Sequence, residues 1–419
     1  MAIIELNSFK SASGRLNALV LLLLFSLPLG QMALSNLLLI LLLLQSLILF
    51  RKKDWAGVFH DSFFWPSALF FIYMALSLSW STNPENGLSQ LETKTSFLLV
   101  PLFLIAGKRH WDPALRDKAL KVFWWGNLLA VAIALLYASY RSIQTGAFYE
   151  TNAFGRRYYF LYTHLASPLM HPGYVGTFVG MAILSALFLQ QKADRMGKRI
   201  YWASIGLFIL FMILLQARIN LIALFFVLGL AALVQAIMSR NYKLLSLPVG
   251  AVILLGTMVL LAPESLKKRY LQVPDFSYDI SGEDFNSATY RLAEWKSAVH
   301  AIDKKPWFGT GLGGNSEALN EAYHDLKFWE GLKKGFNAHN QYLETMLATG
   351  PIGLLLLLYL IGNYAYHAWR QRDYLILLNV LFFAICLSTE SMFERIWAVL
   401  LFTIFFTLMN LKEYGSSGD

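Results

Sequence analysis

Residues 18–50 read ALVLLLLFSLPLGQMALSNLLLILLLLQSLILF and contain no charged side chain. A helix needs about 20 mostly apolar residues to cross the hydrocarbon core of a bilayer, which is ~30 Å thick. Only helices and closed barrels satisfy their backbone polar groups there, and this stretch does not alternate like a barrel strand. It predicts two successive spans, near 16–33 and 36–50. No small-residue cleavage site separates them, so the first is interpreted as a retained anchor.

The composition of the 419-residue chain extends this conclusion to the whole protein. Hydrophobic residues make up 57% and charged residues 15%, and the mean hydropathy is +0.49, which excludes an ordinary soluble domain. Ten further apolar runs predict spans near 64–80, 95–107, 122–140, 171–190, 200–216, 219–238, 245–262, 340–362, 374–389 and 396–411. The expected fold is an all-α integral membrane protein with about twelve transmembrane helices.

A long polar interval divides the chain between the ninth and tenth spans. We expect nine spans over 1–262, a partly helical periplasmic segment over 263–338 and three spans within 339–411. A cytoplasmic tail should follow over 412–419, where Gly-Ser-Ser-Gly resembles a tag linker.

The polar interval carries helical patterns of its own. N-cap candidates at 286–289 precede a helix that should end before Pro306. Its apolar positions follow spacings of three and four: Leu292, Trp295, Val299 and Ile302. A glycine-rich turn over 306–314 and a second helix from about 315 to 330 should follow. The segment is therefore expected to form a partly helical cap over the membrane face.

The positions of the basic residues predict the orientation in the membrane. With the N-terminus inside, nineteen Lys and Arg residues fall in inner segments, six in short outer loops and ten in the long outer segment. Short cytoplasmic loops are enriched in Lys and Arg. Both termini are therefore expected in the cytoplasm, and the net charge of +9 is mostly a consequence of topology.

Several other chemistries have little support in the sequence. Cys386 is the single cysteine, so an intrachain disulfide is excluded. Metal-binding and dinucleotide motifs are absent, and Asp279, Glu283 and Asp284 lie in a Ser/Gly-rich loop where solvated charge is the simpler interpretation. Basic stretches interleaved with aromatic residues are also absent. We expect no metal, no cofactor and no nucleic-acid partner.

Arg218 interrupts 39 mostly apolar residues at the expected junction of two spans. A snorkelling Arg at a turn is the ordinary interpretation. This turn is expected on the outer side, however, where short loops contain few basic residues. A planar, permanently charged guanidinium at that depth is suited to bind an anionic lipid head group, particularly a diphosphate, through paired hydrogen bonds.

The stretch FNAHNQY (336–342) places His339 where the polar segment meets the tenth span. Histidine can accept and return a proton near neutral pH, since its unperturbed pKa is about 6.5. An interfacial histidine that caps the span is the ordinary alternative. No other residue of the chain is better suited to serve as a general base.

Together, these features resemble the bacterial O-antigen ligases and their polymerase relatives. His339 and Asn340 are followed after nine residues by GPIG (350–353). Arg291 lies near the first turn of an amphipathic helix that is followed by the turn PWFGTG (306–311), an arrangement similar to that of the family. The similarity is strongest from about 205 to 400, whereas the first 200 residues match only in having many spans.

The resemblance implies transfer of a glycan from undecaprenyl diphosphate at the outer face of the bacterial inner membrane, without metal or nucleotide. It implies that His339 deprotonates the acceptor hydroxyl while Arg218 and Arg291 hold the diphosphate and stabilise its leaving charge. The spacing of the His motif favours a ligase that uses lipid A-core as acceptor. A polymerase that extends another lipid-linked glycan, or a protein O-glycosylating relative, remains open.

Further positions are weaker candidates for substrate contacts. The ordinary interpretations are a polar helix start, solvated loop charge and a structural ion pair. The candidates are His164, His171 and Tyr174 near the sixth span, Arg156 and Arg157 in the loop 141–170, and Asn340. Glu390 and Glu394, which are expected one helical turn apart, and Arg395 at the outer junction of the last two spans complete the set.

Two other classes of protein share some of these features. A polysaccharide or lipid transporter also suits many spans, but transporters usually carry ionisable residues or broken helices at mid-membrane. Here the unusual polar residues gather at one expected outer face, which favours the enzyme. A non-catalytic scaffold for envelope assembly would tolerate the loss of His339.

Overall fold

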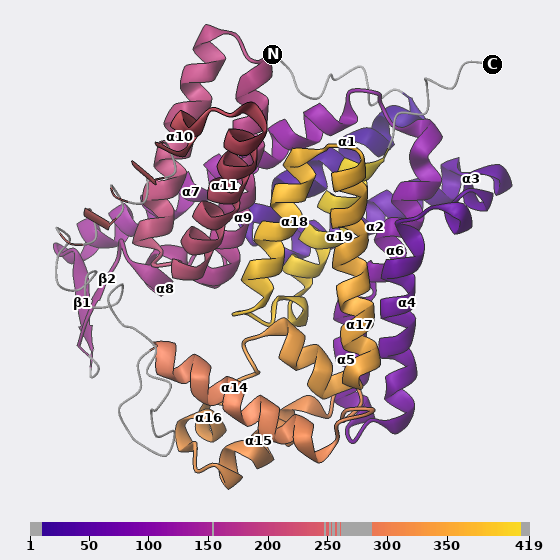
Figure 1. Ribbon diagram of the computed structural model, residues 1–419, viewed down its shortest axis with the longest axis vertical. Helices are drawn as coiled ribbons and strands as arrows, with labels where there is room; N and C mark the ends of the chain where they lie inside the picture. Colours follow the sequence, from indigo (N-terminus) through magenta and orange to yellow (C-terminus); the bar gives the residue numbers. More distant parts are fainter. Residues whose placement is uncertain are drawn as a thin grey trace.

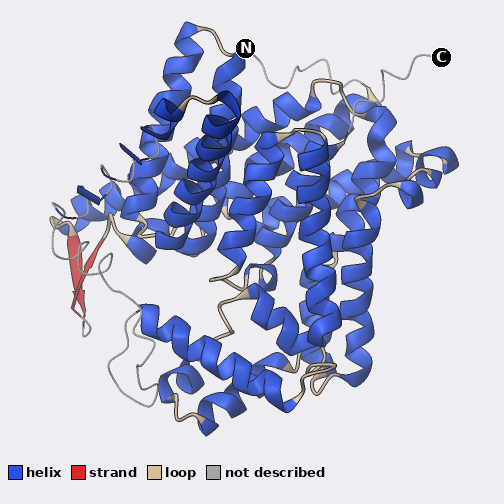
Figure 2. Cartoon of the chain, in the orientation of Figure 1, coloured by secondary structure: helices blue, strands red, loops and turns tan. Residues whose placement is uncertain are grey.

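The computed structural model describes residues 11–152, 155–246, 249–250, 253, 256–257, 260 and 287–411. Its described secondary structure is almost entirely helical (Figure 2), which confirms the helical character expected from the sequence. One antiparallel hairpin departs from the all-α expectation. Its strands are β1 (Tyr149–Asn152) and β2 (Gly155–Tyr158), within the segment expected to be a loop.

Figure 1 shows the order of the helices along the chain. The α-helices are α1 (Ala12–Ser26), α2 (Met32–Leu49), α3 (Lys52–Ala56), α4 (Phe64–Leu76), α5 (Pro84–Lys94), α6 (Ser96–Ala106), α7 (Leu115–Thr145), α8 (Tyr162–Ala166), α9 (Pro172–Leu189), α10 (Arg195–Leu214), α11 (Arg218–Ser239), α14 (Ser287–Lys304), α15 (Asn315–Asp325), α16 (Trp329–Lys334), α17 (Gln341–Arg370), α18 (Tyr374–Leu387) and α19 (Ile396–Asn410). Short 3₁₀ turns are η2 (Leu27–Leu29), η3 (Val58–His60), η4 (Ser77–Trp80), η5 (Gly107–His110), η6 (Gln190–Lys192), η7 (Tyr242–Leu245) and η8 (Met392–Glu394).

Within the described residues, eight helices are long and apolar enough to cross a membrane, or nine if one bent pair is counted as a span. That pair joins Lys52–His60 to Phe64–Trp80 at an angle of 83°. The expected ninth span, 245–262, lies largely outside the described residues. The expected eleventh and twelfth spans are the shorter helices α18 and α19, with 14 and 15 residues. At 1.5 Å per residue, each rises only about 21–23 Å, less than the ~30 Å of a hydrocarbon core.

Small residues let helix α9 pack closely inside the bundle. Its span is 83% buried, and a Cβ added at Gly176 or Gly180 would meet Asn220 of α11 or the ring of Phe382 of α18. α19 lies beside α17 and α18 (Figure 1), and nearly every side chain of α19 is buried. By contrast, α2 exposes Leu47 and Ile48 on its outer face. An apolar exterior of this kind suits contact with lipid rather than water.

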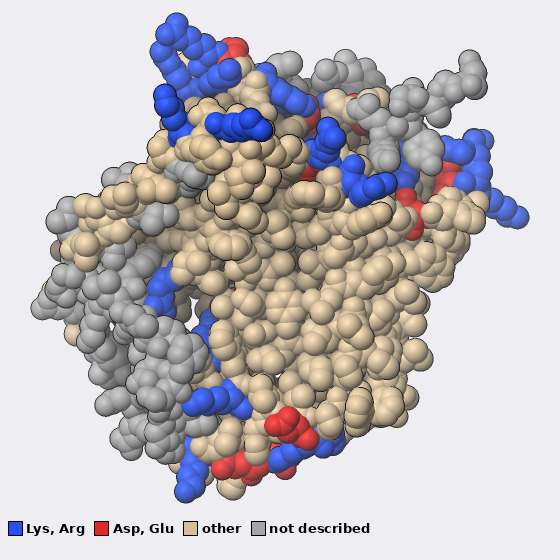
Figure 3. Space-filling model, in the orientation of Figure 1, with Lys and Arg blue, Asp and Glu red and all other residues tan. Residues whose placement is uncertain are grey.

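The charged side chains leave a broad belt uncharged. Figure 3 shows Lys and Arg gathered at the upper end of the molecule and a mixed group of charged residues at the lower end. On the right of this view, uncharged side chains cover most of the surface between them. This distribution and the long apolar helices are those of a multi-pass membrane protein.

Helices α14, α15 and α16 form a small unit at the lower end of the bundle (Figure 1). Its own core is built around Ala298, Leu319, Tyr323 and Phe328. α14 ends before Pro306, as the sequence predicts, but Val299 is exposed rather than part of the buried face. The expected second helix, 315–330, is wrong in its extent. It breaks into α15 and α16 around Lys327, whose φ of 58° is left-handed.

The glycine-rich turn at 306–314 fastens this unit to the bundle. Gly309, Gly311 and Gly313 all have positive φ, and a Cβ at Gly311 would overlap the backbone of Ser81. The N–H of Thr310 donates to the carbonyl of Leu347 at 2.9 Å. The turn therefore has a structural role, in agreement with its interpretation as a helix-ending turn.

Gly350 breaks helix α17 where the glycine-rich turn docks. Its φ of 67° and ψ of −169° are not helical, and Pro351 follows. A Cβ at Gly350 would overlap the carbonyl of Trp307. Residues other than glycine hardly adopt this conformation. Gly350 is thus required for the break in α17 and for contact with the turn.

We predict that Gly350→Ala destabilises the fold by roughly 1–3 kcal/mol or more, because it adds backbone strain and a steric clash. Gly362→Ala in the same helix is the matched control, since a Cβ there meets no atom within 4 Å. It should be neutral or slightly stabilising. Thermal unfolding in detergent measures both; equal midpoints for the two variants would contradict this account of Gly350.

Candidate active site

His339 lies in the connection between α16 and α17, just before the first turn of α17. Its φ is 43°, and its N–H donates to Asn337 Oδ1 at 3.0 Å. The indole Nε1 of Trp295, on α14, donates to the His339 carbonyl at 3.4 Å. These contacts fix the backbone on both sides of the imidazole.

Asn340 caps helix α17. Its Oδ1 accepts the N–H groups of Tyr342 and Leu343 at 3.0 and 3.2 Å. Its own N–H donates to Ser391 Oγ at 3.2 Å. These bonds satisfy backbone groups that a helix start leaves without intrahelical partners.

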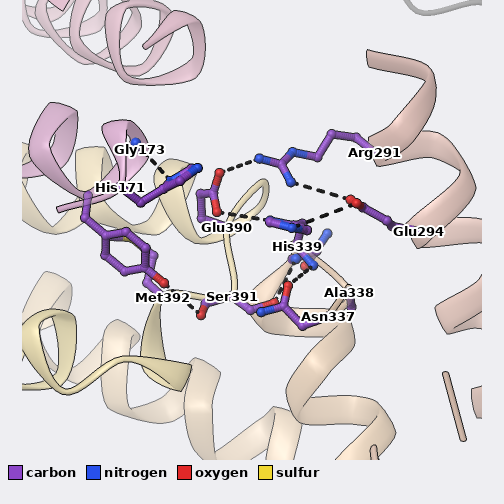
Figure 4. A network of polar contacts seen from close by, with 12 residues as sticks. His171, Gly173, Arg291, Glu294, Asn337, Ala338, His339, Glu390, Ser391 and Met392 are labelled. Carbon is purple, nitrogen blue, oxygen red and sulfur yellow. Dashed lines mark hydrogen bonds and ion pairs between the residues drawn. The ribbon is translucent and has the colours of Figure 1, made fainter. Parts of the chain in front are cut away.

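His339 and three other side chains form a closed ring of polar contacts (Figure 4). His339 Nδ1 lies 3.2 Å from Glu390 Oε2, and His339 Nε2 lies 3.8 Å from Glu294 Oε1. Arg291 pairs with Glu390 Oε1 and, at 3.5 Å, with Glu294 Oε2. We call Arg291, Glu294, His339 and Glu390 the four-residue ring. Its members come from α14, the connection before α17 and the connection between α18 and α19.

The two carboxylates of the ring have opposite pKa shifts. Burial would raise the pKa of Glu390, but Arg291 and His339 outweigh it and hold that pKa at about 2. Burial raises the pKa of Glu294 to about 7, although His339 and Arg291 oppose the shift. Burial would also lower the pKa of Arg291, but Glu390 and Glu294 raise it above its ordinary value. Near neutral pH, Glu390 is therefore an anion, whereas Glu294 can hold a proton.

This asymmetry assigns roles to the two imidazole nitrogens. An ionised Glu390 can only accept, so the short contact to His339 Nδ1 requires a proton on that nitrogen. In neutral His339 the lone pair is then on Nε2. The 3.8 Å to Glu294 is too long for a direct hydrogen bond. Nε2 is therefore the nitrogen that can accept a proton from another molecule.

Arg218 begins helix α11, directly after a three-residue connection from α10, as the sequence predicts. In the same first turn, Asn220 Nδ2 donates to the carbonyl of Gly173 at 3.3 Å. A Cβ at Gly173 would lie 3.2 Å from Glu390 Oε1. The start of α11 and the four-residue ring thus both contact the first turn of α9.

His171 lies beside the ring at the start of α9 (Figure 4), and Tyr174 is on the first turn of the same helix. His171 caps the helix by accepting the N–H of Gly173 at 3.4 Å, and its charge helps to lower the pKa of Glu390. Tyr174 is buried, and its hydroxyl donates to the carbonyl of Ser391 at 3.5 Å. Both residues therefore support the connection that carries Glu390.

The expected grouping of Glu390, Glu394 and Arg395 is only partly correct. Glu394 pairs with the buried Lys94 at 3.0 Å, while Glu390 joins the ring. Helix α18 ends at Leu387, so the two glutamates are not one helical turn apart on a common face. Arg395 is exposed at the start of α19. Of these three residues, Glu390 alone is a member of the ring.

The hairpin carries a separate set of charged residues. Arg157 is exposed on β2 opposite Glu150, and His164 lies 3.6 Å from Glu150. Arg156 pairs with Thr151 in the strand register. Glu150, rather than the four-residue ring, is the charged partner of His164.

Two further glutamates of this region, Glu294 and Glu344, are not among the residues expected from the sequence. Glu294 belongs to the ring, and its position three residues after Arg291 on one helix was the available signal. Glu344 is buried, accepts the N–H of Ala338 at 2.9 Å and Ser391 Oγ at 3.3 Å, and binds the amide of Asn315. Glu344 thereby joins three segments beneath the ring.

The segment that holds most of these residues has a recognisable sequence. Residues 203–358 match the family model described as O-antigen ligase. This match supports the O-antigen ligase superfamily for this segment of the chain. The matched segment contains Arg218, Arg291, Glu294 and His339, whereas Glu390 lies beyond its end. The match indicates a membrane glycosyltransferase of the ligase or polymerase type, with a lipid-linked glycan and an acceptor as partners. No curated protein matches the chain.

The opposite pKa shifts predict opposite effects of two isosteric variants on stability. Glu294 contributes most to the stability of the fold when it is protonated. This contribution is complete below pH ~4.5 and is lost as pH rises through its raised pKa of about 7. Glu390 stabilises the fold when it is ionised. This contribution is complete above pH ~4.5 and is lost only as pH falls toward its lowered pKa of about 2. Relative to wild type, Glu294→Gln should gain stability from pH 5 to pH 8. Glu390→Gln should be less stable by a constant amount over that range.

Thermal unfolding in detergent at pH 5, 6.5 and 8 would measure these differences, which we expect to reach about 2–4 °C. A Glu294→Gln variant that is less stable than wild type by the same amount at every pH would show that Glu294 is ionised throughout.

Proposed function

We propose that this protein transfers a glycan from undecaprenyl diphosphate to an acceptor hydroxyl, with lipid A-core as the favoured acceptor. The family match supports a lipid-linked donor. The observation that carries the proposal is a histidine beside an arginine, with an ionised carboxylate on one ring nitrogen. Among the described residues, its other nitrogen has only the 3.8 Å contact to Glu294. These are the groups that a base-assisted displacement of a diphosphate requires.

The proposed reaction is a single displacement at the anomeric carbon. Nε2 of His339 accepts the proton of the acceptor hydroxyl as its oxygen forms the new glycosidic bond. The bond from the anomeric carbon to the diphosphate breaks, and its electron pair leaves with the undecaprenyl diphosphate. Attack opposite the leaving group inverts the anomeric configuration. Glu390 holds Nδ1–H in place and stabilises the imidazolium as it forms.

Arg291 is the proposed electrostatic partner of the leaving group. Its side chain is 27% exposed, so a diphosphate can reach it, and a guanidinium has five N–H donors. Its terminal nitrogens Nη1 and Nη2 already pair with Glu294 and Glu390, respectively. With a pKa of about 7, Glu294 can take up a proton and release its contact with Arg291 to the incoming anion. Arg218, at the same end of α9, would supply the second guanidinium.

We place this site at the periplasmic face of the bacterial inner membrane, with both termini in the cytoplasm. The excess of Lys and Arg in the opposite loops supports this orientation. The unit α14–α16 carries Arg291 and Glu294, and it lies at the same end of the bundle as His339 (Figure 1). An acceptor and a lipid-linked donor would meet at this end.

The acceptor decides between a ligase and a polymerase, because both would use the same donor and the same ring. Protein O-glycosylation would also share them. The spacing from His339 to GPIG (350–353) favours the ligase. The choice is decided by which acceptor receives the glycan.

We predict that purified protein in detergent, with EDTA present, transfers glycan from undecaprenyl diphosphate to lipid A-core. His339→Ala, Arg218→Ala and Arg291→Lys should each lower the rate by roughly 10²-fold or more, since each removes a group that acts in the transition state. His324→Ala is the matched control, because His324 is an exposed histidine on α15. Gel analysis of lipid A-core and of lipid-linked repeat units in separate reactions measures transfer.

Longer lipid-linked chains without modified lipid A-core would make the protein a polymerase with the same site. Wild-type rates in His339→Ala, with unfolding midpoints that show both proteins folded, would remove His339 from the mechanism. Wild-type rates in Arg218→Ala would do the same for Arg218.

A further inference from the structure

A cavity of about 390 Å³ lies far from the four-residue ring. It is bounded by the start of α7, the end of α9 and the turn that joins α17 to α18. His339 precedes the first residue of α17, whereas the cavity lies beyond its last. Thirty residues of helix extend up to ~45 Å, so the cavity is at the opposite end of the bundle.

The cavity has one basic side and one apolar side. Arg116, Arg372 and Asp373 lie on the basic side, so two guanidiniums face a single carboxylate. The apolar side is formed by Leu184, Leu187, Phe188, Leu375 and Leu378. A volume of this size falls within the ~300–1,000 Å³ typical of ligand sites.

The basic side has hydrogen-bond donors in excess. Arg116 binds Asp373 at 2.5 Å, and the other oxygen of Asp373 accepts the N–H of Ile376 at 3.3 Å. The Nε of Arg116 is buried and has no hydrogen-bond partner in the described part of the chain. Arg372 is exposed and pairs with no carboxylate among the described residues. The Arg116 side chain as a whole is 34% exposed, so an added anion could reach other N–H groups of its guanidinium and offset the excess positive charge.

Exposed aromatic residues mark the depth of the cavity in a membrane. Tyr366 and Trp369 lie on the last turns of α17, and Tyr374, which also lines the cavity, begins α18. Exposed Tyr and Trp side chains gather at the level of lipid head groups. The basic side of the cavity is therefore at a depth where phosphate groups are abundant, and its apolar side extends toward the acyl chains.

We propose that this cavity binds an anionic phospholipid of the phosphatidylglycerol class. The head-group phosphate would accept hydrogen bonds from the exposed part of the Arg116 guanidinium and from Arg372. The first acyl carbons would lie against Phe188 and the leucines of α9 and α18. The excess positive charge favours a lipid with net negative charge over a zwitterionic one. This site is independent of the glycan transfer proposed above, because it shares no residue with the four-residue ring.

The test measures binding of short-chain lipids to the full-length protein in detergent by native mass spectrometry. Dioctanoyl phosphatidylglycerol should bind several-fold more tightly than dioctanoyl phosphatidylcholine. Arg372→Gln should weaken phosphatidylglycerol binding by about fivefold, the effect of roughly one basic contact at a membrane surface. Arg116→Gln should weaken it at least as much. Arg199→Gln, at an exposed position on α10 outside the cavity, should leave binding unchanged.

Leu187→Asp, which adds a charge to the apolar side, should also weaken lipid binding. Equal binding of both lipids, or unchanged binding in the Arg372 and Arg116 variants, would overturn the proposal. Glycerol phosphate distinguishes the sources of the phosphate group. If it binds as tightly as dioctanoyl phosphatidylglycerol, the cavity holds a soluble phosphate and the lipid assignment fails.

Discussion

The pairing of Arg291 with Glu390 is the contact on which the rest of the site depends. It joins the unit α14–α16 to the connection between α18 and α19, segments 99 residues apart in the sequence. A carboxylate as buried as Glu390 is costly unless cations or donors surround it. Arg291 and His339 supply that compensation, and the geometry that results orients the imidazole. Stability and chemistry at this end of the bundle therefore rest on the same charges.

Two glutamates of similar burial have different roles because their neighbours differ. Glu390 has both Arg291 and His339 at close range, whereas the contacts of Glu294 with the same two residues are 3.5 and 3.8 Å long. Desolvation therefore dominates at Glu294, and attraction dominates at Glu390. Pairs of acids separated in this way commonly divide the work of holding and exchanging protons. The ring contains one fixed anion and one group that can change its charge near neutral pH.

The two ends of the bundle present phosphate chemistry in different settings. At one end, Arg291 lies beside His339, as a reaction on a lipid diphosphate would need. At the other end, Arg116 and Arg372 lie beside an apolar wall without a proton acceptor of that kind. The broken helix α17 spans the distance between them, and Gly350 sets its bend. A membrane protein can thus use similar cations for transfer in one place and for anchoring in another.

The sequence by itself determined the helical, membrane-embedded class, the position of His339 before a helix, the helix that carries Arg291, and the family. These follow from local properties: apolar run length, helix-cap residues, and the spacing from His339 to Gly350. Only the tertiary structure decided which charges meet. Glu344 has its role through burial and through partners 29 and 47 residues away, which no local pattern indicates. Glu294 shares a helix with Arg291, but its contact with His339 depends on the tertiary structure. Glu390 and Glu394 were grouped by spacing, yet they diverge because the chain leaves the helix at Leu387. Electrostatic partnership depends on distance in space, which the order of residues does not fix.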